Sequence, residues 1–180
     1  MTDDAPRSLP VLRGKRVTLR AGTAADGAAL RRVFEAPDVV RWWPTPTDDE
    51  LDELLHNGDP EVEVWMIELE GRVVGMIQAY EEDDPMYRHA GIDIVVHPEA
   101  YGRRLGAEAI RVLARHLFED RGHHRLVIDP NAANSRAIHV YERLGFRRVG
   151  VLREYEWSEH EGRWTDGLLL DLLRGELVED

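Results

Sequence analysis

Alternation between apolar and polar positions predicts a series of β-strands along the chain. The stretch 16–20 alternates as a half-buried strand does, whereas Leu126-Val127-Ile128 is wholly apolar, as expected of a central strand covered on both faces. Glu70-Gly71 separates two apolar stretches and favours a hairpin turn. The predicted strands are 16–20, 62–69, 72–80, 90–96, 126–128, 147–155 and 164–173.

Apolar residues at helical spacing predict four helices among these strands. The strongest is 105–120, in which the apolar residues recur on one stripe. A second helix lies before Pro37, and a third spans 47–57. The fourth, 134–144, begins with Asn134 as its N-cap.

The order of these elements predicts an α/β fold with a sheet of mixed strand direction. Several strands come first, then strand, helix, strand and helix, and a closing pair of strands. We therefore expect one domain over residues 1–180. Residues 1–12 contain two prolines and no periodicity, which favours a loose N-terminal arm.

Composition and charge narrow the class of protein. The 180 residues are 43% hydrophobic and 32% charged, as in a folded globular protein. The net charge of -12 disfavours nucleic acid and anionic lipid as partners and favours a cationic small molecule, although an acidic surface can also serve solubility alone. No signal peptide or apolar stretch long enough to span a membrane is present, so we expect a cytoplasmic protein.

Metal and thiol chemistry are not expected. The chain has no cysteine, and its eight histidines show no spacing with carboxylates that is typical of a metal site.

The segment 97–107 follows a predicted strand and opens the strongest helix. A glycine-containing turn at a helix N-terminus presents free backbone N–H groups that bind phosphate, and Arg103 and Arg104 add positive charge. Gly106 allows a bulky anion to approach the backbone. An ordinary strand-to-helix turn with two solvated arginines is the alternative.

A second motif lies at 134–146 and resembles the GNAT superfamily of N-acetyltransferases. The family pattern Asn-x-x-Ala-x-x-x-Tyr-x-x-x-Gly-Phe is matched at Asn134, Ala137, Tyr141, Gly145 and Phe146. The segment 97–107, which opens the strongest helix, also matches the family at three consecutive positions. These are Leu105, Gly106 and Ala107.

Two positions of the first segment depart from the family pattern. Tyr101 stands where arginine or glutamine is usual, and Arg104 replaces the first glycine. Arg104 must therefore tolerate the backbone conformation of that turn. The resemblance nevertheless extends over 16–173, because the element order also follows the family.

The resemblance implies the GNAT fold and acetyl-CoA as the acyl donor. The GNAT fold is a mixed, mostly antiparallel seven-stranded sheet with a splayed central strand pair, flanked by about four helices. The implied donor-binding residues are Val95, Val96, Arg103, Arg104, Leu105, Gly106, Ala107, Asn134, Ala137 and Tyr141. Tyr141 is also implied as the acid that protonates the departing thiolate; the alternative is a core aromatic.

Three short features resemble the aminoglycoside 6′-N-acetyltransferases. They are the paired Trp42 and Trp43 in an aromatic loop, the sequence Gly91-Ile92-Asp93, and Asp129-Pro130 before the asparagine motif. The acceptor implied is a cationic amine. Three alternatives stay open: a RimJ/RimL-type protein N-terminal acetyltransferase, a polyamine or siderophore-lysine acyltransferase, and a GNAT module without catalysis. The protein can be a monomer or a homodimer.

An ammonium must lose a proton before it attacks a thioester, so a carboxylate near it assists the reaction. We expect Asp93 to be the general base and Asp129 to bind the substrate ammonium; a structural ion pair and a turn cap are the respective alternatives. Trp42 and Trp43 are expected to cover or stack on the acceptor, unless one belongs to the core. Tyr80 and Glu81, at the end of a strand, are further candidates for acceptor binding, and a solvated turn is the alternative for the acidic run that begins at Glu81.

Overall fold

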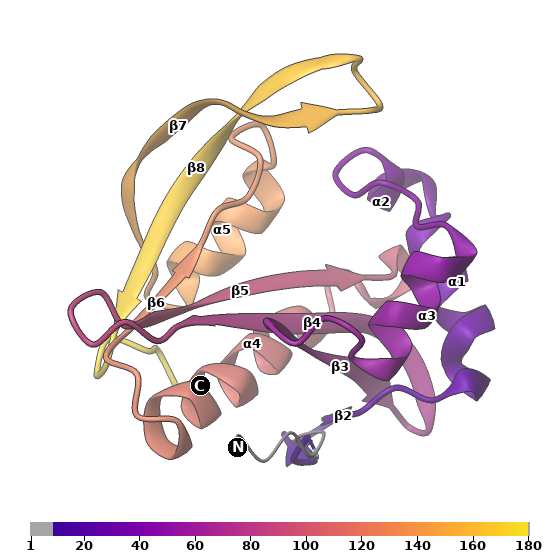
Figure 1. Ribbon diagram of the computed structural model, residues 1–180, viewed down its shortest axis with the longest axis horizontal. Coiled ribbons are helices and arrows are strands. Elements are labelled where there is room, and N and C mark those ends of the chain that lie inside the picture. The colour runs from indigo at the N-terminus through magenta and orange to yellow at the C-terminus, as the bar shows by residue number, and fades with distance from the viewer. Residues whose placement is uncertain (1–8, 180) are drawn as a thin grey trace, which may run out of the picture.

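A computed structural model describes residues 9–179, and its strands form an eight-stranded sheet in the order β1-β2-β3-β4-β5-β6-β8-β7 (Figure 1). Every neighbouring pair is antiparallel except β5 and β6, which are parallel. The strands are β1 Leu12–Arg13, β2 Val17–Arg20, β3 Val62–Leu69, β4 Arg72–Glu82, β5 His89–Val96, β6 Arg125–Ile128, β7 Arg147–Ser158 and β8 Arg163–Leu173. The α/β class and the mixed, mostly antiparallel sheet are confirmed.

Helices cover both faces of the sheet. α4 and α5 pack on one face against apolar residues such as Ile77 and Leu170, and α1 and α3 pack on the other face against Met66 and Met76. The helices are α1 Gly27–Phe34, α2 Pro37–Val40, α3 Asp48–His56, α4 Leu105–Arg115 and α5 Ser135–Arg143. A π-helical turn, His116–Asp120, continues α4.

The central strand pair splays apart, as expected. β5 and β6 pair at only two positions, Ala90 with Leu126 and Gly91 with Val127. Beyond Gly91 the two strands diverge (Figure 1). The β6-facing edge of β5 from residue 92 to 96 therefore has no strand partner in the part of the chain that the structure describes.

The described residues contain one strand and one helix more than the sequence predicted. Leu12–Arg13 forms β1 within the expected arm, and the Pro10 carbonyl accepts a hydrogen bond of 3.1 Å from Trp65 Nε1. Residues 9–12 are therefore docked, whereas the rest of the arm, 1–8, lies outside the described residues. The aromatic segment expected as a loop begins with the short helix α2, which Pro37 opens at its first position.

An ion-pair cluster fixes β2 to the first helices. The Arg20 guanidinium donates to both oxygens of Asp26 at 2.8 and 2.9 Å and to Glu68 on β3 at 2.6 Å. Asp26 also accepts from the backbone N–H of Thr23 at 2.9 Å. These hydrogen bonds, that from Arg20 first, lower the pKa of the buried Asp26 from 3.8 to about 2 despite the loss of water around it.

We predict that Asp26→Asn reduces the acid sensitivity of folding. Because the pKa of Asp26 is lower in the folded state, its stabilisation is complete above pH 5 and is lost as the pH falls toward 2, for a total of about 2 kcal/mol. Urea unfolding should show that the wild type loses about 1 kcal/mol more than Asp26→Asn between pH 5 and pH 3. Asp83→Asn, at an exposed turn, should behave as the wild type. Parallel pH dependences for Asp26→Asn and the wild type would contradict the prediction.

Candidate active site

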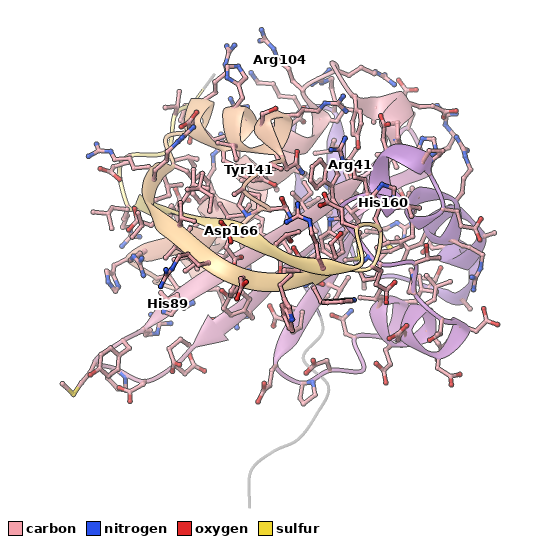
Figure 2. The ribbon with its side chains drawn as sticks, turned by 90° about the horizontal axis from the view of Figure 1, so that it is seen from above. Arg41, His89, Arg104, Tyr141, His160 and Asp166 are labelled. Carbon is pink, nitrogen blue, oxygen red and sulfur yellow. The ribbon has the colours of Figure 1, made fainter. Side chains whose placement is uncertain are left out.

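A cleft of about 1200 Å³ opens where β5 and β6 part. Its walls come from α2 and the residues after it, the turn before α4 and α4 itself, α5 along its length, and β7. The cleft exceeds the roughly 300–1,000 Å³ typical of small-molecule sites, so it has room for two substrates. In Figure 2, Tyr141 lies between Arg104 at one edge of the molecule and Asp166 on the β7–β8 hairpin.

The floor of the cleft is formed by alternate residues of β4 and β5. Gln78 lies opposite Asp93 and donates to its carboxylate at 3.1 Å. The next pair on this face is Tyr80 and Gly91, and a Cβ atom at Gly91 would lie 1.9 Å from Cζ of Tyr80. The absence of a side chain at Gly91 therefore makes room for the Tyr80 ring in the cleft.

Three carboxylates gather at this end of the cleft: Asp93, Asp129 and Glu156. Loss of water raises the pKa of Asp93, and the negative charge of Asp129 raises it further, while the hydrogen bond from Gln78 opposes both. Loss of water also raises the pKa of Glu156, with Asp129 and Asp93 adding to the shift. The negative charges of the three carboxylates repel one another, and a bound cation would reduce that repulsion.

Tyrosine hydroxyls lie among these carboxylates. Burial, followed by the charges of Asp93 and Asp129, raises the pKa of Tyr141 above its ordinary value. Burial likewise raises the pKa of Tyr80 to about 12. Both phenols are therefore protonated near neutral pH and can donate a proton or a hydrogen bond.

The turn before α4 is the segment predicted to bind phosphate. Gly102 and Arg104 both adopt left-handed backbone conformations, with φ of 72° and 60°. Leu105, Gly106 and Ala107 all line the cleft, and Leu105 also belongs to the buried core. A Cβ atom on Gly106 would come no closer than 3.5 Å to Val96, so packing within the chain does not require glycine there.

The remaining expected donor-binding residues lie on both sides of the same groove. Val95 and Val96 belong to the free edge of β5, and Asn134 and Ala137 line the groove from α5. Asn134 also caps α5, since its side-chain oxygen accepts from the N–H of Ala137 at 3.2 Å. The expected N-cap is thus confirmed, and the donor-binding role remains a prediction.

Arg103 lies outside the main cleft. It lines a smaller hollow on the other side of the turn with Lys15, Arg16 and Arg111, and its carbonyl oxygen accepts from Arg16 at 2.8 Å. Arg104 lines both spaces.

Trp42 and Trp43 both line the cleft but in different ways. Trp43 packs edge to face on Phe34 of α1, with ring centroids 5.9 Å apart, and so extends the core. Trp42 lies beside the Arg41 guanidinium at 4.8 Å. Trp42 is therefore the tryptophan that the core leaves available for an acceptor.

Glu81 does not face the cleft, which corrects the expectation that it binds the acceptor. Successive residues of a strand point to opposite faces, so Glu81 lies on the α4 side while Tyr80 lies in the cleft. There it forms an ion pair with Arg121 and a hydrogen bond with the fully buried His123. Glu81 is a structural residue.

The structure also places in the cleft several residues that the sequence reasoning missed. Tyr101, at a position that departs from the family pattern, lies 4.4 Å below the guanidinium of Arg136 from α5, and Arg136 lies 3.8 Å from Asp38 of α2. Gln78 could have been found from the alternation with Tyr80 along β4. Tyr155 and Glu156 are adjacent in sequence, and alternation alone would place only one of them in the cleft.

Within residues 9–179, no group of three or more His, Asp or Glu side chains is arranged to hold a metal ion. The same part of the chain has no helix with the length and apolar character needed to cross a membrane.

The fold and the site define a GNAT acetyltransferase. The family model for the acetyltransferase (GNAT) domain matches residues 16–147, and the chain belongs to this family of acetyl-CoA-dependent N-acetyltransferases.

The chain is similar in sequence to two kinds of small-molecule N-acetyltransferase. The chain is 32% identical to the aminoglycoside N(6′)-acetyltransferase type 1 of Klebsiella pneumoniae over 157 residues, with 76% of each chain covered. It is 28% identical to the spermidine N(1)-acetyltransferase of Escherichia coli K12 over 141 residues, covering 76% of this chain and 75% of that one. The structure of Mycobacterium smegmatis RimJ in complex with CoA-disulfide superposes with a TM-score of 0.80 at 24% identity, covering 95% of this chain and 89% of that one.

We predict that Arg104→Gly stabilises the protein while it weakens the binding of acetyl-CoA. Glycine adopts the left-handed conformation without the cost of about 1 kcal/mol or more that a side chain incurs. Arg104→Ala is the matched control, since it also removes the cation but keeps the strained backbone. Calorimetric titration should show a Kd raised roughly 3- to 10-fold in both variants, as for the loss of one hydrogen bond or charge contact. Thermal unfolding should show that Arg104→Gly, but not Arg104→Ala, is more stable than the wild type. Equal stability of the two variants would contradict the prediction that the backbone at Arg104 is strained.

Proposed function

We propose that the protein transfers the acetyl group of acetyl-CoA to a primary amine of a small polycation, and that the acceptor is the 6′-amine of an aminoglycoside. The observation that carries this proposal is the cluster of Asp93, Asp129 and Glu156 at the end of the cleft where β5 and β6 part. The relationship to an aminoglycoside N(6′)-acetyltransferase supports it independently.

The donor is proposed to occupy the groove between α4 and α5. The turn at 102–107 would hold the pyrophosphate through backbone N–H groups and the Arg104 cation. The free edge of β5 near Val95 and Val96 would hold the pantetheine arm, with Asn134 and Ala137 on the opposite side. This arrangement would direct the thioester toward Tyr141.

The acceptor ammonium would enter the carboxylate cluster, which attracts it electrostatically. Asp93 then accepts one proton from the ammonium, directly or through a water molecule, and the amine becomes a nucleophile. The raised pKa of Asp93 brings it closer to neutrality and makes it a stronger base than an ordinary carboxylate. Asp129 would hold the polycationic acceptor in place.

The transfer itself exchanges one bond for another. The amine nitrogen attacks the thioester carbonyl carbon, the C–N bond forms, and the C–S bond then breaks. Tyr141 donates its proton to the departing thiolate and regains one from solvent. The nitrogen loses its second proton to solvent to give the amide, and Asp93 releases the proton that it accepted. The raised pKa of Tyr141 keeps the proton on the phenol until the thiolate forms.

A linear polyamine is the second candidate acceptor. The relationship to spermidine N(1)-acetyltransferase favours it, and such a molecule would satisfy the same carboxylates. The likeness to RimJ, at 24% identity, supports the fold alone. The left-handed backbone at Arg104 keeps the turn in the conformation that glycine would adopt, so this departure does not argue for a module without catalysis.

A CoA-thiol release assay with kanamycin, tobramycin, spermidine, and a peptide with a free N-terminal alanine tests the proposal. We expect saturable turnover with the two aminoglycosides and kcat/KM at least tenfold lower for the peptide, which brings fewer charges to the cluster. The acetylated position of the product should be assigned by NMR. Turnover of spermidine alone would select the second candidate, and turnover of the peptide alone would contradict both.

We predict that Asp93→Asn lowers kcat roughly 100-fold or more, as expected for loss of a general base. In the wild type, kcat/KM should rise with pH, and the midpoint should lie above the ordinary carboxyl range because the pKa of Asp93 is raised. Asp93→Asn should remove this rise. Asp83→Asn, a matched change at an exposed turn outside the cleft, should keep both kcat and the pH profile. An unchanged kcat in Asp93→Asn would exclude Asp93 as the base.

A further inference from the structure

Strand β7 is interrupted at the point where it passes the acceptor end of the cleft. Its register with β8 shifts between Leu152 and Glu156. Within this bulge Glu154 has a φ of 49°, a left-handed conformation that is uncommon for a residue with a side chain. The Glu154 N–H donates to the Asp166 carboxylate of β8 at 2.8 Å, which holds the bulge in place.

The bulge changes which side chains reach the cleft. In a regular strand, neighbouring side chains point to opposite faces, yet Tyr155 and Glu156 both line the cleft. A β-bulge redirects side chains in this way and is often found beside active sites.

The ring of Tyr155 packs at a specific position on β8. A Cβ atom at the buried Gly167 would lie 2.8 Å from Cδ1 of the Tyr155 ring, so the ring occupies the space that a side chain would need. Gly167 also forms a β-bridge with Asn131, two residues after Asp129. The position on which the Tyr155 ring packs is therefore connected to the segment that carries Asp129.

A chain of hydrogen bonds strengthens this connection. Asn131 Nδ2 donates to Thr165 Oγ1 at 2.8 Å, and Thr165 Oγ1 donates to the Glu156 carbonyl oxygen at 3.1 Å. Tyr155 and Asp129 line the same cleft, and the Tyr155 hydroxyl lies close enough to the Asp129 carboxylate for that group to raise the pKa of Tyr155. Tyr155 is 52% exposed, so its place is set by these contacts and not by burial in a core.

We propose that Tyr155 is a positioning residue that fixes the direction of the Asp129 carboxylate, so that Asp129 binds a second ammonium of the acceptor while Asp93 serves the reacting amine. This inference rests on the proposed function and deepens it. The acceptor class it selects is an amine with at least two positive charges. A monoamine does not use the Asp129 subsite.

Steady-state kinetics of Tyr155→Phe test the inference. We expect KM for tobramycin or spermidine, whichever the wild type acetylates, to rise 5- to 10-fold with kcat within twofold, and KM for a monoamine such as benzylamine to stay unchanged. Gly167→Ala, which displaces the ring but keeps the hydroxyl, should have the same effect, and the double variant should lose no more than either single variant. Thermal unfolding of each variant separates this effect from a loss of fold.

Tyr87→Phe removes an exposed phenol outside the cleft and is the matched control. Equal increases of KM for monoamine and polycation, or an unchanged KM for both, would overturn the inference. A fall in kcat alone would also overturn it, because a positioning role at Asp129 predicts an effect on binding.

A second measurement does not depend on turnover. The hydrogen bond to Asp129, together with partial burial and the charges near Tyr80 and Asp93, raises the pKa of Tyr155. In a ¹³Cζ-tyrosine NMR titration, Asp129→Asn should lower the pKa of Tyr155, and an unchanged titration would overturn the pairing. Absence of turnover in the wild type with a shifted titration would contradict the proposed function and leave the Tyr155–Asp129 pair supported.

Discussion

The site depends on the early separation of β5 and β6. The two strands pair at only two positions and then diverge, which leaves backbone N–H and C=O groups on the free edge of β5. Unpaired backbone groups away from water are costly, so this edge is stable only if a ligand or solvent satisfies it. The same divergence separates α4 from α5 and carries Asp93 and Asp129 to the two sides of one opening. The proposed donor groove and the proposed acceptor pocket are thus consequences of one break in the sheet.

Two glycines allow tyrosines to form the acceptor end of this opening. Gly91 makes room for the ring of Tyr80, and Gly167 makes room for that of Tyr155. The phenols bring hydroxyl groups among the carboxylates without adding charge. A wall of this kind can bind several ammonium or hydroxyl groups, which suits an amino sugar or a polyamine better than an apolar amine.

Much of the fold could be predicted because its signals are local. Strand β3 has the expected limits, and α5 begins after the expected N-cap Asn134. The first strand was missed because two residues carry no periodicity. The position of this strand depends on residues far away in the sequence, since the neighbouring Pro10 carbonyl accepts a hydrogen bond from Trp65.

The candidate site was predictable where it follows a motif or a regular strand, and not elsewhere. Gly106 and Tyr141 lie in motifs, and the structure places both in the cleft. Glu81 was misplaced because proximity in sequence to Tyr80 was given more weight than the alternation of faces. Glu156 could not be found, since its direction depends on a bulge that is held by a hydrogen bond to Asp166.

The charges in and beside the cleft are separated in a way that would sort the two proposed substrates. The chain has a net charge of -12, yet its one lysine, Lys15, lies with Arg103 and Arg104 beside the turn before α4. The carboxylates Asp93 and Asp129 lie at the other end, where the sheet splits. A polyanionic donor is attracted to the first end and repelled by the second, and a polycationic acceptor experiences the reverse. The two proposed substrates would therefore occupy one continuous cleft with little competition, and they would meet near the buried Tyr141.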